Sequence, residues 1–420
     1  MKILIRQAQI ASPANPLHGQ VQDIFIEGET IVQIAPHIDS PVDQTLEAPG
    51  LIVSPGWVDP FAHFCDPGLE HRENLASGAA AAAAGGYTRV LVVPNTKPVA
   101  DSKSQITYIL NSSAYLPAYI HPLGALTRGT EGKELAEMYD MQQNGAIAFT
   151  DGLSSVQQPG LLLKALQYVK AFDGVVIQLP VDKSIGAHGL MNEGIISTQM
   201  GLPGIPALAE EIMVKRDLDL LRYTQSKLHI TGISTAKSLQ LIQDARNEGW
   251  KVTCSVTPYH LLFCDEDLQE YDTRLKVNPP LRKSSDRAAL RQGILDGTID
   301  CIATHHLPQH SDQKTCEFEY AAWGMIGLQT SFAIINQIFP DLSEQRIAEL
   351  FSLNASNIFG LPTTDIREGE KAELSFFSKQ GSTTLTPSNN QSKSHNSPHM
   401  NETLPGKVWG TFVKSQFNPQ

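Results

Sequence analysis

The sequence contains few cysteines and no closely spaced pair of them. Five are present, an odd number without the CxxC spacing of redox and zinc motifs, at Cys65, Cys254, Cys264, Cys301 and Cys316. The N-terminal stretch MKILIRQAQI is too short and too polar to serve as a signal peptide. We therefore expect reduced thiols and a cytoplasmic location.

The sequence also lacks a surplus of positive charge and any long apolar run. Its formal net charge is -12, whereas surfaces that bind nucleic acid or anionic lipid need clustered Lys and Arg. No apolar stretch approaches the roughly 18 residues that a membrane span needs. We expect a soluble protein whose partner is a small molecule or another protein, with no nucleic-acid or membrane surface.

The 420 residues are enough for one large domain and one smaller one. Residues 1–50 alternate short apolar stretches with turn residues such as Gly28 and Pro36, which predicts a small antiparallel sheet. After residue 355 the chain returns to similar short apolar stretches, AELSFFSK (372–379) and GKVWGTFVKS (406–415). Between them, the composition of residues 381–405 predicts a loop, and it leaves open whether that loop is ordered.

Between residues 51 and 355, apolar strands alternate with helical stretches. The run Ala79 to Ala84 followed by Gly85 predicts a helix with a glycine at its C-terminal end. Eight strand candidates are present: LIVSPGWVDPFAHF (51–64), TRVLVVPN (88–95), AYIHPLGAL (118–126), GAIAFTD (145–151), GVVIQLPV (174–181), KLHITGIS (227–234), KVTCSVTP (251–258) and DCIATHH (300–306).

This alternation predicts an α/β protein built on a (β/α)8 barrel of the TIM type. The barrel is expected over residues 53–355. The two chain ends, residues 1–52 and 356–420, are expected to form one small β-sandwich beside it.

Several ordered motifs carry a resemblance to a known family. They include PGWVD (55–59), DPGLEHREN (66–74), VPNTKP (93–98), AFTDG (148–152), GLPGIPALAEE (201–211), VTPYHL (256–261), KVNPPLR (276–282), DGTIDCIAT (296–304) and GMIGLQT (324–330). On these motifs the chain resembles the dihydroorotase branch of the amidohydrolase superfamily over essentially its whole length. The resemblance implies metal-assisted opening or closure of a cyclic amide.

In that branch, zinc is held by an HxH pair at strand 1, a carboxylate at strand 4 and histidines at strands 5 and 6. An Asp at strand 8 serves as general base. A zinc-bound water has a pKa near ~7, compared with ~15.7 for bulk water, so the metal supplies hydroxide at neutral pH. The six corresponding positions here are, in chain order, Phe61, His63, Asp151, Gln178, Gly232 and His305.

Only His63 and Asp151 keep the residue types of the family. The substrate-binding positions have changed as well, because Cys65 stands where the family has an Arg for the substrate carboxylate, and Gln309 where it has a later His. Asn95 and Asn278 match asparagines that contact substrate in the family.

The resemblance leaves three functions open. The first is a catalytically inactive dihydroorotase-like protein that binds no cofactor. Because degenerate dihydroorotases assemble with aspartate carbamoyltransferase in several bacteria, the resemblance implies that this chain supports that enzyme in pyrimidine synthesis, within a homo- or hetero-oligomer. In this case Phe61 closes the former metal pocket with apolar surface, and His63 is a hydrogen-bonded residue of the barrel.

The second function is a hydrolase of cyclic amides with a rearranged site. His63, Asp151 and His305 would hold one metal ion, zinc, since two histidines and a carboxylate suffice for that. The third is an ordinary dihydroorotase, which interconverts carbamoyl aspartate and dihydroorotate. Whether the protein is an enzyme is therefore open from the sequence.

Overall fold

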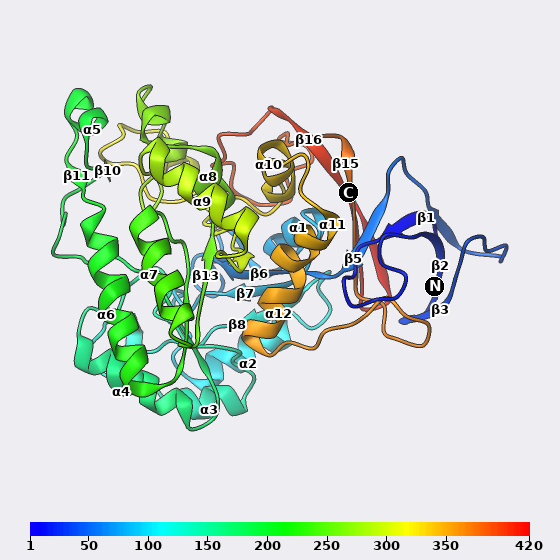
Figure 1. The fold of residues 1–420 in the computed structure, drawn as a ribbon, viewed down its shortest axis with the longest axis horizontal. Coiled ribbons are helices and arrows are strands. Elements are labelled where there is room, and N and C mark those ends of the chain that lie inside the picture. Colours follow the sequence, from blue (N-terminus) through cyan, green and yellow to red (C-terminus); the bar gives the residue numbers. More distant parts are fainter.

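Short apolar stretches from both ends of the chain form one sheet. The computed structural model describes residues 1–420 and shows this sheet beside the barrel (Figure 1). Its strands are β1 (Lys2–Ile10), β2 (Val21–Glu27), β3 (Thr30–Ala35), β4 (Gln44–Leu46), β5 (Ile52–Pro55), β15 (Leu374–Thr384), β16 (Thr403–Val413) and β17 (Gln416–Pro419).

The two chain ends meet where β5 pairs antiparallel with β15, in the strand order β17-β16-β15-β5-β1-β2-β3, with β4 beside β1. Ile3, Ile24, Phe376 and Phe412 belong to the buried core of this domain. The predicted small domain made from both chain ends is therefore confirmed.

The barrel consists of parallel strands whose ladder closes on itself. Its strands are β6 (Trp57–Ala62), β7 (Tyr87–Val92), β8 (Tyr119–Pro122), β9 (Val175–Gln178), β12 (Lys227–Ile230), β13 (Val252–Val256) and β14 (Cys301–Ile302). The expected fourth strand, 145–151, joins the ladder only through Phe149, which bridges Gly124 and Val176. A bridge between Ala62 and His306 closes the ring.

The structure thus confirms the predicted (β/α)8 barrel, with strand 4 shorter than expected. Helices surround the strands (Figure 1). They are α1 (Leu75–Ala84), α2 (Lys103–Ser112), α3 (Met138–Gln143), α4 (Pro159–Lys170), α6 (Leu208–Thr224), α7 (Ala236–Asn247), α9 (Ser284–Asp296), α10 (Ser331–Ile338), α11 (Glu344–Ala348) and α12 (Asn354–Phe359).

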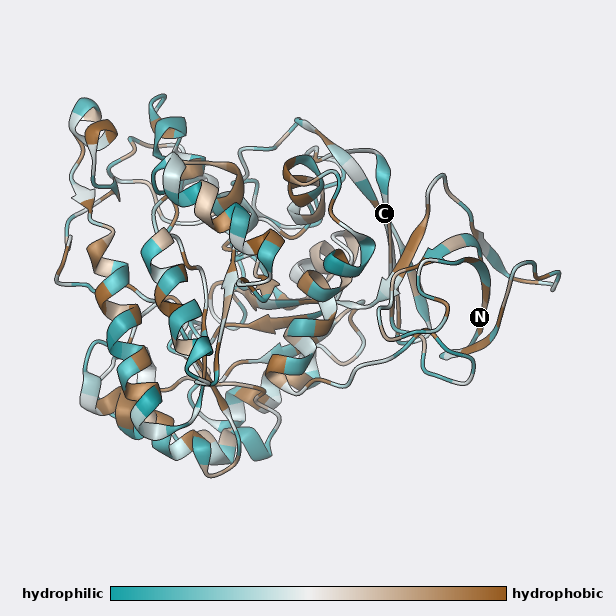
Figure 2. Ribbon diagram, in the orientation of Figure 1, coloured by the Kyte–Doolittle hydropathy of each residue, from teal (hydrophilic) through white to brown (hydrophobic).

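Shorter elements lie in the loops that follow the strands. These are β10 (Met191–Asn192), β11 (Gly204–Ile205), α5 (Ile195–Met200), α8 (Pro258–Leu262) and the 3-10 turns η1 (Arg128–Thr130), η2 (Asp265–Leu268), η3 (Thr273–Leu275) and η4 (Ser311–Gln313). The π-helical turn η5 (Glu349–Leu353) joins α11 to α12. Figure 2 shows hydrophobic residues along the central strands and hydrophilic ones on the outward faces of the helices. No helix is both long and apolar enough to cross a membrane.

Local sequence explains how α1 begins and how it packs. The Asn74 side chain accepts a hydrogen bond from the Ser77 amide at 2.8 Å and so caps the first turn. The helix continues through the alanine run to Ala84, as predicted. Gly78 lies against Phe64, and a Cβ at Gly78 would stand 2.6 Å from that ring. The small residues of α1 therefore allow it to pack closely on the residues after strand 1.

The two expected domain boundaries each fall inside an element. Strand β5 continues past residue 52 to Pro55, because its last residues still pair with β15. Helix α12 continues past residue 355 to Phe359 and ends at Gly360, whose φ of 63° is a left-handed conformation that suits glycine. The barrel therefore begins near Trp57 and ends near Gly360.

The polar segment from residue 385 to residue 402, between β15 and β16, is packed on the barrel mouth. The amide of Asn396 donates to the carbonyls of Leu307 and Gly324 at 3.0 and 3.1 Å, and its oxygen accepts from the Gln309 amide at 3.2 Å. Ser392 donates a hydrogen bond to the buried carboxylate of Glu73. The segment thus ties the loop after strand 1 to the loop after strand 8.

Candidate active site

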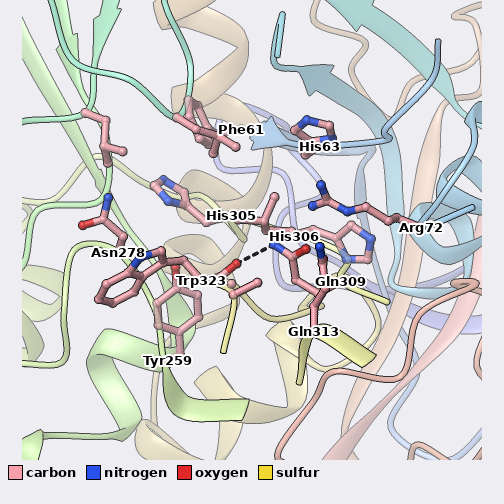
Figure 3. A pocket seen from close by; sticks show the side chains of 15 residues that line it. Phe61, His63, Arg72, Tyr259, Asn278, His305, His306, Gln309, Gln313 and Trp323 are labelled. Carbon is pink, nitrogen blue, oxygen red and sulfur yellow. Dashed lines mark hydrogen bonds between the residues drawn. The ribbon is translucent and has the colours of Figure 1, made fainter. Parts of the chain in front are cut away.

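A cavity of about 370 Å³ opens at the C-terminal ends of the barrel strands (Figure 3). This is the end at which barrel enzymes place their reactive groups. Side chains after strand 1 and after strand 8 supply most of its polar surface, and Asn278 adds an amide. Of the residues singled out in the sequence, Phe61, His63, Asn278, His305 and Gln309 line this cavity.

Both ring nitrogens of His63 are used by the backbone. Nδ1 accepts a hydrogen bond from the Cys65 amide at 2.9 Å, so Nε2 carries the proton and donates to the Asn95 carbonyl at 3.0 Å. Burial, with a smaller contribution from the Arg72 charge, lowers the pKa of His63 to about 4. In this arrangement neither nitrogen offers a free lone pair to a metal ion.

An aromatic pair lies where the resemblance to the dihydroorotase branch places the reaction centre. Phe61 and His305 lie with ring centroids 4.4 Å apart and ring planes inclined by 33°. Phe61 is also part of the apolar cluster that fills the barrel interior. His305 bonds through Nε2 to the Thr231 hydroxyl at 2.8 Å, and burial lowers its pKa to about 3.

The ring of His305 also excludes any side chain at position 232. Gly232 has a φ of 66°, and a Cβ there would lie 2.6 Å from Cε1 of His305. A side chain at the strand 6 position and the present His305 conformer are therefore mutually exclusive. The residues at positions 232 and 305 are therefore sterically coupled.

The remaining two family positions do not offer ligands to the cavity. Both carboxylate oxygens of Asp151 accept hydrogen bonds from Thr127, from its amide at 2.8 Å and its hydroxyl at 2.6 Å. Burial raises the pKa of Asp151 to about 6, although these hydrogen bonds oppose the shift. Gln178 is buried, and neither amide atom has a hydrogen-bond partner within the protein. Neither residue is among those that line the cavity.

These contacts decide whether a zinc centre of the family's kind fits the chain. Phe61, Gln178 and Gly232 supply no metal-binding nitrogen, and the lone pair of His63 is engaged by the Cys65 amide. No group of three or more His, Cys, Asp or Glu side chains within residues 1–420 is arranged to hold a metal ion. The residues present do not fit the dinuclear zinc site that the resemblance implies.

The two asparagines singled out in the sequence differ in their surroundings. Asn95 is engaged by the strand 4 loop, because its oxygen accepts from the Leu153 amide at 2.9 Å and its nitrogen donates to the Asp151 carbonyl at 3.0 Å. Asn278 lines the cavity, and its side chain makes no hydrogen bond within the protein. Cys65 is fully buried, and burial raises the pKa of its thiol to about 12, so it is an unreactive thiol.

Arg72 is the charged residue of this cavity, and the sequence did not single it out. It lies in the DPGLEHREN motif, nine residues after His63, and no spacing rule associates it with a site. Its Nε and Nη2 atoms donate to the Pro308 carbonyl at 2.9 and 2.7 Å, and its guanidinium points toward the cavity (Figure 3). The available signal was the presence of this arginine in a motif shared with the family.

Comparisons with known proteins agree with this architecture. A family model described as dihydro-orotase-like matches residues 50–238. A protein named dihydroorotase from Pelotomaculum thermopropionicum is 39% identical over 418 residues, covering 98% of this chain and 97% of the relative. One of the same name from Syntrophus aciditrophicus is 38% identical over 421 residues, covering 99% of each.

Solved structures resemble the chain in fold at lower identity. The L-hydantoinase (dihydropyrimidinase) from Arthrobacter aurescens superimposes with a TM-score of 0.85 at 22% identity, covering 99% of this chain and 95% of that one. At this identity the likeness concerns the fold, a barrel with an attached β-sandwich.

Proposed function

The chain belongs to the dihydroorotase family, and we propose that it keeps the family's fold without performing the dihydroorotase reaction. The observation that carries the proposal is the packing of Phe61 on His305 at the place of the reaction centre, at a centroid distance of 4.4 Å. An apolar ring at that place removes a ligand and fills part of the space a metal-bound water needs. Without metal activation, water keeps a pKa near ~15.7, and one general base contributing ~10² to 10⁴-fold does not compensate.

The role we propose is structural, within de novo pyrimidine synthesis. The chain supports the assembly of aspartate carbamoyltransferase as a non-catalytic partner. Retention of the complete barrel and β domain supports this role, because a partner surface depends on the fold and not on the reaction centre. The names of the relatives support the pathway, and the changed site supports the loss of turnover.

Two measurements test the proposal, one for each part. The purified chain is assayed in both directions with added zinc, with the Pelotomaculum relative assayed in parallel as the positive control. We expect no turnover above background from this chain; zinc-dependent turnover contradicts the loss of activity. The aspartate carbamoyltransferase of the same cell is then purified with and without this chain. We expect its oligomer to be incomplete without the chain, and full assembly and activity without it contradict the structural role.

A hydrolase with one metal ion is the second candidate, because His63 and His305 line the same cavity. It requires the His63 ring to release the Cys65 amide and the Asp151 carboxylate to release Thr127. Metal analysis after mild purification tests it. We expect less than about a tenth of an equivalent of zinc, and one equivalent that is lost in a His63→Ala variant would support this candidate instead.

A further inference from the structure

The cavity at the barrel mouth is lined without a single carboxylate. No Asp or Glu is among its lining residues, and Arg72 is its one permanent charge. Nδ1 of His306 accepts a hydrogen bond from the Gly327 amide at 3.2 Å, and its Nε2 lies 3.4 Å from the Glu73 carboxylate, which is outside the lining. A ligand in this cavity therefore meets the Arg72 cation and no acidic side chain of the lining.

The Arg72 guanidinium is held in place but not neutralised. Its side edge, Nε and Nη2, is fixed by the Pro308 carbonyl at 2.9 and 2.7 Å. Nη1 has no acceptor within the protein, and no carboxylate of the chain lies within salt-bridge distance of the group. The outer edge formed by Nη1 and Nη2 is the edge that receives a carboxylate in a two-point hydrogen bond. Arg72 is thus a pre-oriented cation without a partner.

The rest of the cavity offers flat apolar walls and free amides. Phe61, Tyr259 and Trp323 contribute rings, and Asn278 and Gln313 contribute amide groups that make no hydrogen bond within the protein (Figure 3). A volume of about 370 Å³ lies within the range of small-molecule sites. Rings favour a planar ligand, and the unpaired cation favours a negative one.

We propose that this cavity binds a small planar monoanion, an aromatic carboxylate, through Arg72 and without a metal ion. The carboxylate takes the outer edge of the guanidinium, and the ligand ring lies among the aromatic side chains. This inference rests on the proposed function in one respect: the ligand is retained and not converted, so the former reaction site becomes a binding site.

A matched pair of probes tests the role of the charge. Nicotinate and nicotinamide have the same pyridine ring, but nicotinate carries a carboxylate where nicotinamide carries an uncharged amide. Each is titrated into the full-length chain by calorimetry with excess EDTA present. We expect saturable binding of nicotinate, with a Kd on the order of 1 mM or tighter, and binding of nicotinamide at least roughly tenfold weaker. Equal affinities, or no saturable binding of nicotinate, would overturn the proposal.

Three variants locate the binding to this cavity. Arg72→Met removes the charge at similar length, and Ala322→Trp fills the cavity from a lining position without touching Arg72. Arg128→Met is the control, since it removes an exposed arginine paired only with Glu134 and Glu137. We expect the first two to weaken nicotinate binding at least roughly tenfold and the control to leave it unchanged.

Loss of binding counts only in variants that unfold at the same temperature as the parent. If Arg72→Met is destabilised, Ala322→Trp decides the outcome. Unchanged nicotinate affinity in a correctly folded Arg72→Met or Ala322→Trp chain would refute the site. The binding is measured on the isolated chain, so a failure to bind nicotinate does not contradict the role in transferase assembly. Equally, full transferase assembly without this chain does not contradict the binding site.

Discussion

At the scale of single residues, the positions that differ from the family's metal-binding residues constrain one another. His305 packs on Phe61, bonds to Thr231 and occupies the space next to Gly232. The Thr231 hydroxyl is also hydrogen-bonded to the Ser255 hydroxyl at 2.9 Å. The Ser255 hydroxyl is in turn hydrogen-bonded to Nε2 of His229 at 3.0 Å. The centre of the mouth is therefore a packed and hydrogen-bonded arrangement, and reversal of one substitution would not recreate a ligand set.

Gly232→Ala tests this coupling. We expect the free energy of unfolding to fall by about 2 to 3 kcal/mol, because the left-handed backbone opposes a side chain and the new Cβ meets the His305 ring. In a His305→Ala background the same substitution should cost only about 1 to 2 kcal/mol, which is the backbone contribution alone. Urea unfolding of the four chains of this cycle measures the difference. Equal costs in both backgrounds would mean that the ring moves aside freely.

At the scale of elements, sequence patterns predicted the strands and helices better than the loops. Alternation of apolar and polar residues identified the barrel, and the alanine run identified α1, because burial leaves a periodic pattern. Residues 385–402 carry no such pattern, since they are held by side-chain bonds to distant carbonyls. Phe61 and Gly232 were recognisable in the sequence as departures from the family's ligand residues, but the partners of His63 and the direction of Arg72 depend on neighbours far along the chain.

Asn396→Ala tests how the segment 385–402 is held. The substitution leaves the carbonyls of Leu307 and Gly324 and the Gln309 amide without their partner, which we expect to cost about 2 to 3 kcal/mol. Hydrogen exchange should accelerate in this segment before the barrel strands change. The exposed Asn247→Ala serves as a control with little effect. Unchanged exchange in the segment would show that Asn396 does not anchor it.

Glu73 gives the same region a dependence on pH. Burial alone would raise the pKa of Glu73, but hydrogen bonds from His306, Ser392 and Ser77 outweigh burial and hold it below its usual 4.5. A lowered folded-state pKa means that the carboxylate stabilises the fold above about pH 4.5 and that this contribution is lost as the pH falls through the folded-state pKa.

Glu73→Gln should therefore lower the free energy of unfolding by about 2 kcal/mol at pH 7, and by clearly less near pH 4. Urea unfolding of parent and variant at both pH values measures this. The control Glu134→Gln changes an exposed carboxylate and should differ little at either pH. If Glu73→Gln lowers the free energy of unfolding equally at pH 4 and pH 7, the pKa of Glu73 is not lowered in the folded state.

At the scale of the whole molecule, a buried ion pair joins the two domains. Arg89 on β7 of the barrel donates to both carboxylate oxygens of Glu373, the residue before β15, at 2.6 and 2.7 Å. Thr88 adds a third bond to this carboxylate at 2.8 Å. Both charged side chains are less than 10% exposed. Removal of one partner would leave an uncompensated charge between the domains.

Glu373→Gln should lower the free energy of unfolding by about 3 to 5 kcal/mol, the cost of breaking a buried ion pair. Asp219→Asn is the matched control, because it breaks the exposed pair of Lys215 and Asp219 and should cost less than about 0.5 kcal/mol. Chemical denaturation followed by far-ultraviolet circular dichroism compares the two. Similar costs for the two variants would show that the Arg89–Glu373 pair contributes no more than a surface pair.

The pairing of β5 with β15 has a consequence for the order in which a ribosome delivers this chain. Strands β1 to β5 are synthesised before the barrel, but β15, the neighbour of β5, and the segment across the mouth are synthesised after it. A chain synthesised only through the barrel therefore holds an exposed strand edge on β5 and an unsealed barrel. A stop codon after the barrel but before β15 would release a molecule with both defects.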